Sequence, residues 1–167
     1  MVSVRQAETG ADFKTVWSLI ADMGEWDARE CAARGIPGSD VIQTYYNYTA
    51  DRLTAAFSAP GTAMFIARLD GAAAGCCGYA DAGDGAAELC KMFVQPDFRG
   101  RGAARALVST VLSGMQESRF SEARLVTVNF MTEAISLYRS FGFDPCAPFE
   151  DVPESLKDIT VYFKRAL

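Results

Sequence analysis

The sequence predicts an α/β (α+β) fold, in which helices flank a mixed, mostly antiparallel sheet of about seven strands. Hydrophobic spacing changes along the chain in the order strand, one or two helices, three strands, helix, strand, helix, strand. The 167 residues suit one domain, residues 1–167, with a sizeable core. Half of the residues are hydrophobic and 22% are charged, as in ordinary globular domains.

The first third of the chain predicts one strand and one clear helix. Residues 2–7 alternate weakly, as a strand does. A helix is expected over 11–23, where apolar residues follow helical spacing at Phe13, Val16, Trp17, Ile20 and Met23. Residues 24–60 are less regular and predict only a short helix at 49–53, capped by Thr49.

Three consecutive strands are expected next. They cover 62–69, 72–80 and 86–94. Asp70-Gly71 favours a tight hairpin between the first two strands, and residues 81–85 form a second turn. The three strands therefore form a meander.

The last third predicts helices that alternate with strands. A helix over 103–116 is followed by a strand over 123–129. Apolar residues on one face predict a helix over 134–141, which Gly142 ends. A final strand alternates over 159–164.

Composition disfavours several classes of function. The net charge of −5 makes a general nucleic-acid role unexpected. No apolar run is long enough to span a bilayer, so we expect no membrane association. The first residues lack the pattern of a signal peptide, which favours a cytoplasmic protein.

The cysteines and the lack of histidine limit the available chemistry. Five scattered cysteines with no C-x-x-C pair predict neither a metal site nor a disulfide framework. Cys76, Cys77 and Cys90 lie in apolar strands and are expected to be buried and inert. Because the chain has no His, carboxylates, Tyr, Cys or water must carry any acid–base step.

A glycine-rich segment joins the strand at 86–94 to the helix at 103–116. The first amides of a helix lack internal partners and carry the positive end of its dipole. Gly100 and Gly102 let the backbone approach an anion, and Arg99 and Arg101 add positive charge. The segment therefore predicts a site for a phosphate or a diphosphate.

Two common phosphate-binding motifs do not fit this segment. A Walker loop needs Gly-Lys-Ser/Thr, but Ala103 and Ala104 follow Gly102 here. A dinucleotide-binding turn needs a third glycine, and Arg105 stands in its place.

The segment Arg99-Gly100-Arg101-Gly102-Ala103-Ala104 resembles the R/Q-x-x-G-x-G/A signature of the GNAT N-acetyltransferase superfamily. Two flanking segments, Glu88–Pro96 and Ala134–Phe143, are similar to that family's fourth strand and its A-x-x-L-Y-x-x-x-G-F helix. The resemblance covers about residues 62–143. It implies an acyl-CoA N-acyltransferase-like fold, acetyl-CoA as the donor and an amine as the acceptor.

The resemblance also assigns a place to each part of acetyl-CoA. It implies that the diphosphate is held by the Arg99 side chain and by the amides of Gly100, Arg101, Gly102, Ala103 and Ala104. The pantetheine arm would lie beside the strand residues Met92, Phe93 and Val94. One amide there, expected to be that of Val94, would polarise the thioester carbonyl.

Two catalytic side chains are expected. The resemblance makes Tyr138 the general acid for the leaving thiolate, and the alternative is a core tyrosine. Glu88 is the candidate general base, because its strand parity places it with Cys90, Met92 and Val94 on an apolar face that would raise its pKa. The alternatives are a solvent-exposed Glu88 or a water chain, and a bulge in the strand would break the parity.

Asn129 ends the strand before the helix at 134–141. The family often has a cofactor-binding Asn nearby, but its usual place is taken here by Met131. We expect Asn129 to cap the helix instead.

The acceptor is expected to be a small amine or an amino-acid-like compound. An aromatic group (Trp26, Tyr45, Tyr46, Tyr48) and an acidic group (Asp144, Glu150, Asp151, Glu154) would suit a cationic amine, although solvated loops and core aromatics also explain them. A non-catalytic acyl-CoA-binding or sensing module and an enzyme that acylates a protein amine are the alternative functions. The acyl length and the oligomeric state stay open, and a homodimer is compatible with the sequence.

Overall fold

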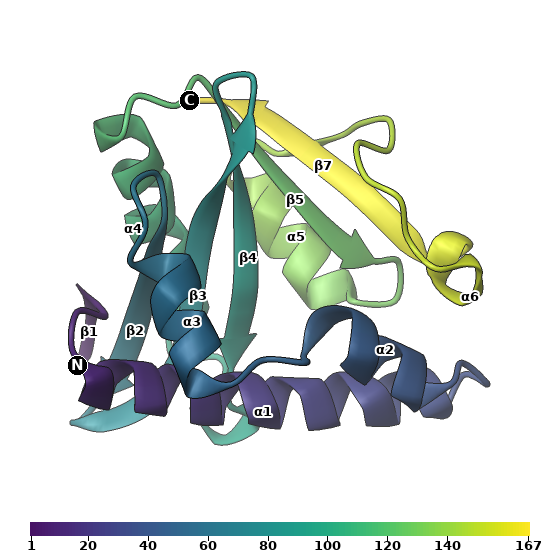
Figure 1. The fold of residues 1–167 in the computed structure, drawn as a ribbon, viewed down its shortest axis with the longest axis horizontal. Helices are drawn as coiled ribbons and strands as arrows, with labels where there is room; N and C mark the ends of the chain where they lie inside the picture. The colour runs from purple at the N-terminus through teal and green to yellow at the C-terminus, as the bar shows by residue number, and fades with distance from the viewer.

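The computed structural model describes all 167 residues and contains one seven-stranded sheet with the order β1-β2-β3-β4-β5-β7-β6 (Figure 1). Neighbouring strands are antiparallel except β4 and β5, which are parallel. The predicted mixed, mostly antiparallel sheet is therefore confirmed. The strands are β1 (Val2–Gln6), β2 (Ala63–Leu69), β3 (Ala72–Gly83), β4 (Ala86–Val94), β5 (Glu122–Val128), β6 (Asp144–Pro145) and β7 (Thr160–Ala166).

Helices cover both faces of the sheet (Figure 1). One buried core joins the sheet to α4 and α5, and a second core joins it to α1 and α3. None of the helices combines the length with the hydrophobicity that a membrane span requires. The helices are α1 (Gly10–Ala32), α2 (Gly38–Tyr45), α3 (Ala50–Phe57), α4 (Ala103–Glu117), α5 (Thr132–Ser140) and α6 (Glu154–Lys157), with a short 3₁₀ turn, η1, at Pro96–Phe98.

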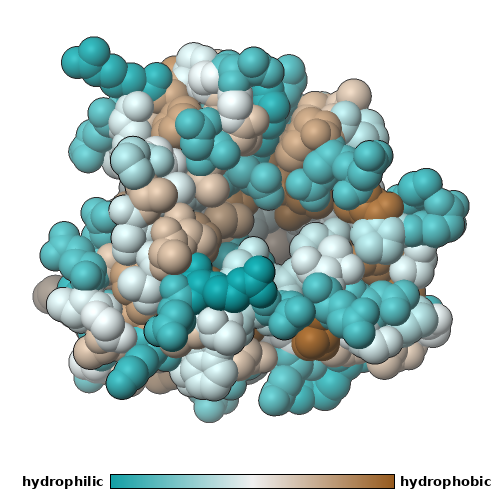
Figure 2. Space-filling view, viewed as in Figure 1, coloured by the Kyte–Doolittle hydropathy of each residue, from teal (hydrophilic) through white to brown (hydrophobic).

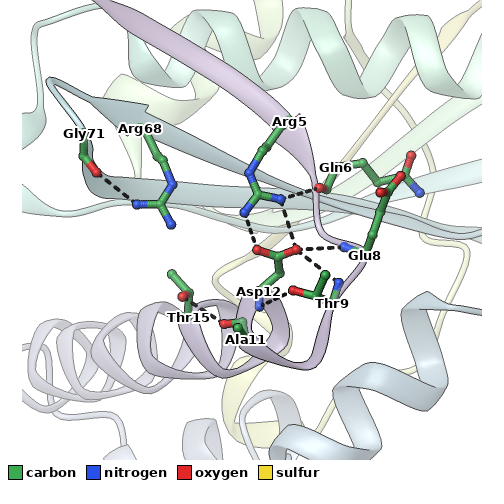
Figure 3. Close-up of polar contacts among 9 residues, drawn as sticks. All are labelled: Arg5, Gln6, Glu8, Thr9, Ala11, Asp12, Thr15, Arg68 and Gly71. Atoms are coloured by element: carbon green, nitrogen blue, oxygen red, sulfur yellow. Dashed lines mark hydrogen bonds and ion pairs between the residues drawn. The ribbon is translucent and has the colours of Figure 1, made fainter.

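A capping box fixes the start of α1. The Thr9 side chain accepts a hydrogen bond from the Asp12 amide, and the Asp12 carboxylate accepts one from the Thr9 amide. Two nitrogens of the Arg5 guanidinium donate to the same carboxylate, which is buried (Figure 3). This arrangement joins the end of β1 to the first turn of α1.

The turns before β3 and after α5 have the predicted chemistry. Asp70 and Gly71 both have positive φ, 51° and 88°, as a type I′ hairpin turn requires. Gly142 follows α5 with a φ of 81°, so it takes the predicted left-handed position. The Thr49 side chain caps α3 as expected.

Helix α1 extends well past the predicted end at residue 23. The helix continues through Gly24, where the packing of Tyr46 requires a glycine. A Cβ at Gly24 would lie 2.9 Å from Cγ of Tyr46, closer than real contacts allow. The glycine therefore marks a close approach between α1 and the end of α2, and the sequence pattern did not reveal this contact. The short elements α2, β6 and α6 were also not predicted.

Strands β4 and β5 pair over only part of their length. Residues Ala86–Leu89 pair with Glu122–Leu125, and the two strands separate beyond this point. Figure 1 shows the separation widening toward α1 and α2. The sheet is thus divided into two halves that share a joined end and an open end.

Candidate active site

A cavity of about 720 Å³ lies where β4 and β5 separate. Its walls come from α1, α2, β4, the start of α4, β5, α5 and the segment before β7. Figure 2 shows this face hollowed between the two halves of the molecule, with hydrophobic residues around the hollow. A cavity of this size can hold a small molecule or much of a cofactor.

The predicted anion-binding loop lines part of the cavity wall. Gly100 and Gly102 have φ values of 72° and 88°, a conformation that favours glycine. Gly102 is the N-cap of α4, and no side chain caps this helix. None of the backbone amides from Gly100 to Arg105 donates to an acceptor within the protein. The loop therefore presents a set of free N–H donors at the positive end of a helix.

The two arginines of this loop lie in different places. Arg99 lines the cavity, where its Nε donates to the Val94 carbonyl at 3.0 Å and its guanidinium lies 4.7 Å from the centre of the Trp26 ring. Arg101 instead pairs with Asp70 at 2.9 Å. All the other residues expected to act in catalysis or in cofactor binding line the cavity, and only Arg101 does not.

The register of β4 corrects one prediction. Cys76 pairs with Phe93 whereas Gly78 pairs with Cys90, so β4 carries an extra residue, and Lys91 there has a φ of 54°. After this bulge, Met92 and Val94 pack with the α4 core, whereas Cys90 and Phe93 pack with the α1 core. The predicted parity of Glu88 with Met92 and Val94 is therefore wrong, because the bulge reverses the alternation.

Tyr138 extends from α5 into the cavity. Its side chain is buried, and its ring meets Phe143 edge-on, with centroids 6.1 Å apart. The Tyr138 hydroxyl has no hydrogen-bond partner in the protein. Every fully buried polar side-chain atom does have a partner, so this hydroxyl is not fully buried and faces the cavity that Tyr138 lines. Burial raises the pKa of Tyr138 well above its usual value, which keeps the phenol protonated.

Glu88 lines the same cavity from near the start of β4. Its carboxylate is partly buried and makes no hydrogen bond or ion pair with the protein. Burial, aided by the negative charge of Glu150 and opposed by Lys91, raises the pKa of Glu88 to about 7. A carboxylate with this pKa can exchange a proton near neutral pH.

The aromatic group expected to receive an amine holds a side chain of this protein instead. The Lys91 ammonium donates to the Tyr45 carbonyl and lies 5.2 Å and 4.7 Å from the ring centres of Tyr46 and Tyr48. The Tyr46 hydroxyl donates to Asp27. Burial raises the pKa of Asp27 to about 6.

Lys91 and Asp27 were not singled out in the sequence. The signal for Lys91 was a charged residue inside the apolar run Leu89–Val94. Asp27 had no such signal, because it lies in the part of α1 that was not predicted to be helical.

Two further predictions need correction. Asn129 does not cap α5, whose N-cap is Met131, and its side chain lies 3.5 Å from the Asp158 carbonyl, to which it donates. Of the four acidic residues expected at the acceptor rim, only Glu150 lines the cavity.

A model of the acetyltransferase (GNAT) family matches residues 22–143, which include the loop, β4, β5 and α5. The chain belongs to the GNAT family. Its glycine-rich loop and its separated β4 and β5 are therefore features of a GNAT domain, and the acyl-CoA N-acyltransferase-like fold is confirmed.

Curated relatives support this assignment over part of their length. The chain is 32% identical over 97 residues to the uncharacterized N-acetyltransferase YjgM of Escherichia coli (strain K12), covering 56% of this chain and 58% of that protein. It is 32% identical over 111 residues to the IAA acetyltransferase of Azospirillum brasilense, covering 66% of this chain and 71% of that protein.

Solved structures share the whole fold at low identity. The ribosomal-protein-alanine N-acetyltransferase of Brucella melitensis has a TM-score of 0.75 at 17% identity, with 99% of each chain covered. PaiA N-acetyltransferase of Thermoplasma acidophilum, solved in complex with coenzyme A, has a TM-score of 0.73 at 16% identity, with 100% of this chain and 99% of that chain covered.

Proposed function

We propose that this GNAT protein is an N-acetyltransferase that moves an acetyl group from acetyl-CoA to the primary amine of a small molecule. One observation carries the proposal: a loop whose amides at residues 100–105 have no partner in the protein borders the cavity that Tyr138 and Glu88 also line. Diphosphate oxygens are acceptors suited to such amides at a helix start.

The shape of the cavity suits the rest of coenzyme A. Beyond Leu89, the edge of β4 faces the cavity without a β5 partner. An extended pantetheine arm can bond to such an edge as an added strand does. Met92, Phe93 and Val94 line this path, and an amide of this segment would polarise the thioester carbonyl.

The two unpartnered side chains support direct transfer. Glu88 accepts a proton from the acceptor ammonium, and the freed amine nitrogen attacks the carbonyl carbon of the thioester. A C–N bond forms as the C–S bond breaks, the new amide nitrogen releases its extra proton to water, and Glu88 then gives its own proton to solvent. Tyr138 donates its phenolic proton to the leaving sulfur, and the phenolate then recovers a proton from water.

The part of the cavity around Glu88, where the acceptor amine would bind, is called the acceptor end. Its walls favour a small molecule over a protein amine. Tyr45 from α2, Glu150 before α6 and Leu156 in α6 all line this end of the cavity. Two segments that are far apart in the sequence, the end of α2 and residues 150–156, thus flank the space, whereas a protein terminus would need an open groove. A non-catalytic sensing module would need neither a cavity-facing phenol nor an unpartnered carboxylate.

The test is release of free CoA from acetyl-CoA in the presence of amine panels. We expect release with one class among amino acids, polyamines and aminoglycosides, together with a matching acetylated product. Turnover only on peptide N-termini or protein lysines would contradict the small-molecule acceptor. Binding of acetyl-CoA without turnover on any amine would favour the sensing module.

A further inference from the structure

Lys91 occupies an unusual position for a lysine. The bulge gives it a left-handed backbone in the middle of β4, and its side chain enters the cavity instead of solvent. Glu88 lies three residues earlier on the same strand and lines the same cavity. The bulge therefore places a cation and a carboxylate together at the acceptor end.

The Lys91 ammonium has no anionic partner. No carboxylate lies within 4.0 Å of Nζ, and the Tyr45 carbonyl is its one hydrogen-bond acceptor. An ammonium has three N–H donors, so two remain available. Burying part of a charged group without a counter-ion costs free energy, and a ligand of opposite charge would offset that cost. Burial accordingly lowers the pKa of Lys91.

The carboxylates near Lys91 are separated from it or otherwise engaged. Asp27 accepts the Tyr46 hydroxyl, and Glu88 and Glu150 make no ion pair with any side chain. The acceptor end thus offers one ammonium and two carboxylates, those of Glu88 and Glu150, that form no ion pair with one another. A molecule with both an amine and an acidic group complements this arrangement.

We propose that the acceptor is an amino acid or a similar amine, whose carboxylate binds the Lys91 ammonium while its amine faces Glu88. This inference rests on the proposed acetyl transfer and specifies its substrate class. The Tyr46 and Tyr48 rings and the Tyr45 carbonyl hold the ammonium in place for this contact. Lys91 is then a specificity-determining residue and takes no part in proton transfer.

The first arm of the test compares matched acceptors. CoA release is measured with L-amino acids that have small, aliphatic, aromatic and acidic side chains, and with the corresponding amino-acid amides. The native enzyme should prefer at least one acid over its amide by about tenfold or more, mainly in KM. Lys91→Met should lose this preference and Lys91→Arg should keep most of it. Comparing the variants cancels the different basicities of acids and amides.

The second arm detects binding without turnover. The Cε signal of Lys91 is followed by NMR in ¹³C-lysine-labelled protein and is assigned by its loss in Lys91→Met. It should shift on titration with the preferred amino acid and stay in place with the amide. This readout separates the two proposals, because a failure of acetyl transfer would leave the shift intact.

Three results would overturn the inference. Equal use of acids and amides by the native enzyme would show that no carboxylate is recognised. If Lys91→Met still preferred acids over amides, a residue other than Lys91 would be the one that binds the carboxylate. Acetylation of Lys91 itself, found by mass spectrometry after incubation with acetyl-CoA, would show that this ammonium occupies the acceptor position.

Discussion

At the residue scale, burial raises the pKa of both Tyr138 and Glu88, but with different consequences near neutral pH. Both side chains reach the cavity without a protein partner. Burial keeps the phenol protonated, whereas it brings the carboxyl pKa to about 7. Near neutral pH the phenol therefore holds its proton, while the carboxyl group can exchange one, as the proposed acid and base require.

Replacing Tyr138 by Phe should lower kcat far more than the affinity for acetyl-CoA. The ring still fills its place against Phe143, while the proton donor is lost. A positioned acid contributes on the order of 10²-fold, so we expect a loss of about that size with a nearly unchanged Kd. Steady-state kinetics and calorimetry measure the two quantities. Equal losses in both would point to a structural role for the hydroxyl.

The pH profile tests the proposed role of Glu88. The base must be deprotonated to act, so kcat/KM of the native enzyme should fall as the pH drops below about 7. Glu88→Gln should lower kcat/KM by about 10²-fold and keep only the limb due to the acceptor amine.

Glu150 supplies a control for this profile. Its negative charge raises the pKa of Glu88, so Glu150→Gln should shift the limb to lower pH without removing it. A Glu88→Gln profile that matches the native one would rule out Glu88 as the base.

At the element scale, the start of α1 depends on one buried carboxylate. Asp12 accepts hydrogen bonds from Arg5 and from the amides of Glu8 and Thr9 (Figure 3). The Arg5 guanidinium, with these amides, holds the pKa of Asp12 well below its usual range. The contact fixes the helix that carries Trp26 and Asp27 along the cavity wall.

Asp12→Ala should lower the free energy of unfolding by roughly 1–2 kcal/mol at pH 7, measured by urea denaturation. Because folding lowers the pKa of Asp12, its contribution is complete above the unfolded pKa of about 4. The difference between native protein and variant should shrink as the pH falls below that value. Glu8→Ala is the matched control, since the Glu8 side chain makes no contact of this kind and should leave stability nearly unchanged. A difference that stays constant down to pH 2 would contradict the role of the charged carboxylate.

At the scale of the whole molecule, local sequence patterns predicted the sheet and the glycine-rich loop. The features that were not predicted depend on packing between segments that are far apart in the sequence. Asp70-Gly71, Gly102 and Gly142 have the backbone conformations that their turns require, so the residue type alone indicated them. The β4 bulge could not be predicted, because it depends on how β3 packs. A Cβ at Gly75 would lie 2.3 Å from the Phe93 carbonyl oxygen, and no pattern within β4 reports this contact.

The acceptor end was predicted least well for the same reason. Tyr46 contacts α1 and Lys91 through packing between segments that are far apart in the sequence. Of the four aromatic residues expected there, Trp26, Tyr45 and Tyr46 line the cavity and Tyr48 does not. Only the three-dimensional structure shows that Lys91 lies against the Tyr46 and Tyr48 rings.

The account as a whole depends on diphosphate binding by the loop amides, and calorimetric titration with acetyl-CoA tests this most directly. We expect measurable binding by the native protein and a loss of about tenfold or more in Gly102→Ala, because a side chain disfavours the left-handed backbone that aims the amides. Gly83→Ala is the matched control, with a φ of 78° and equally open surroundings, and should bind as the native protein does. Absence of binding by the native protein, or equal losses in both variants, would contradict the account.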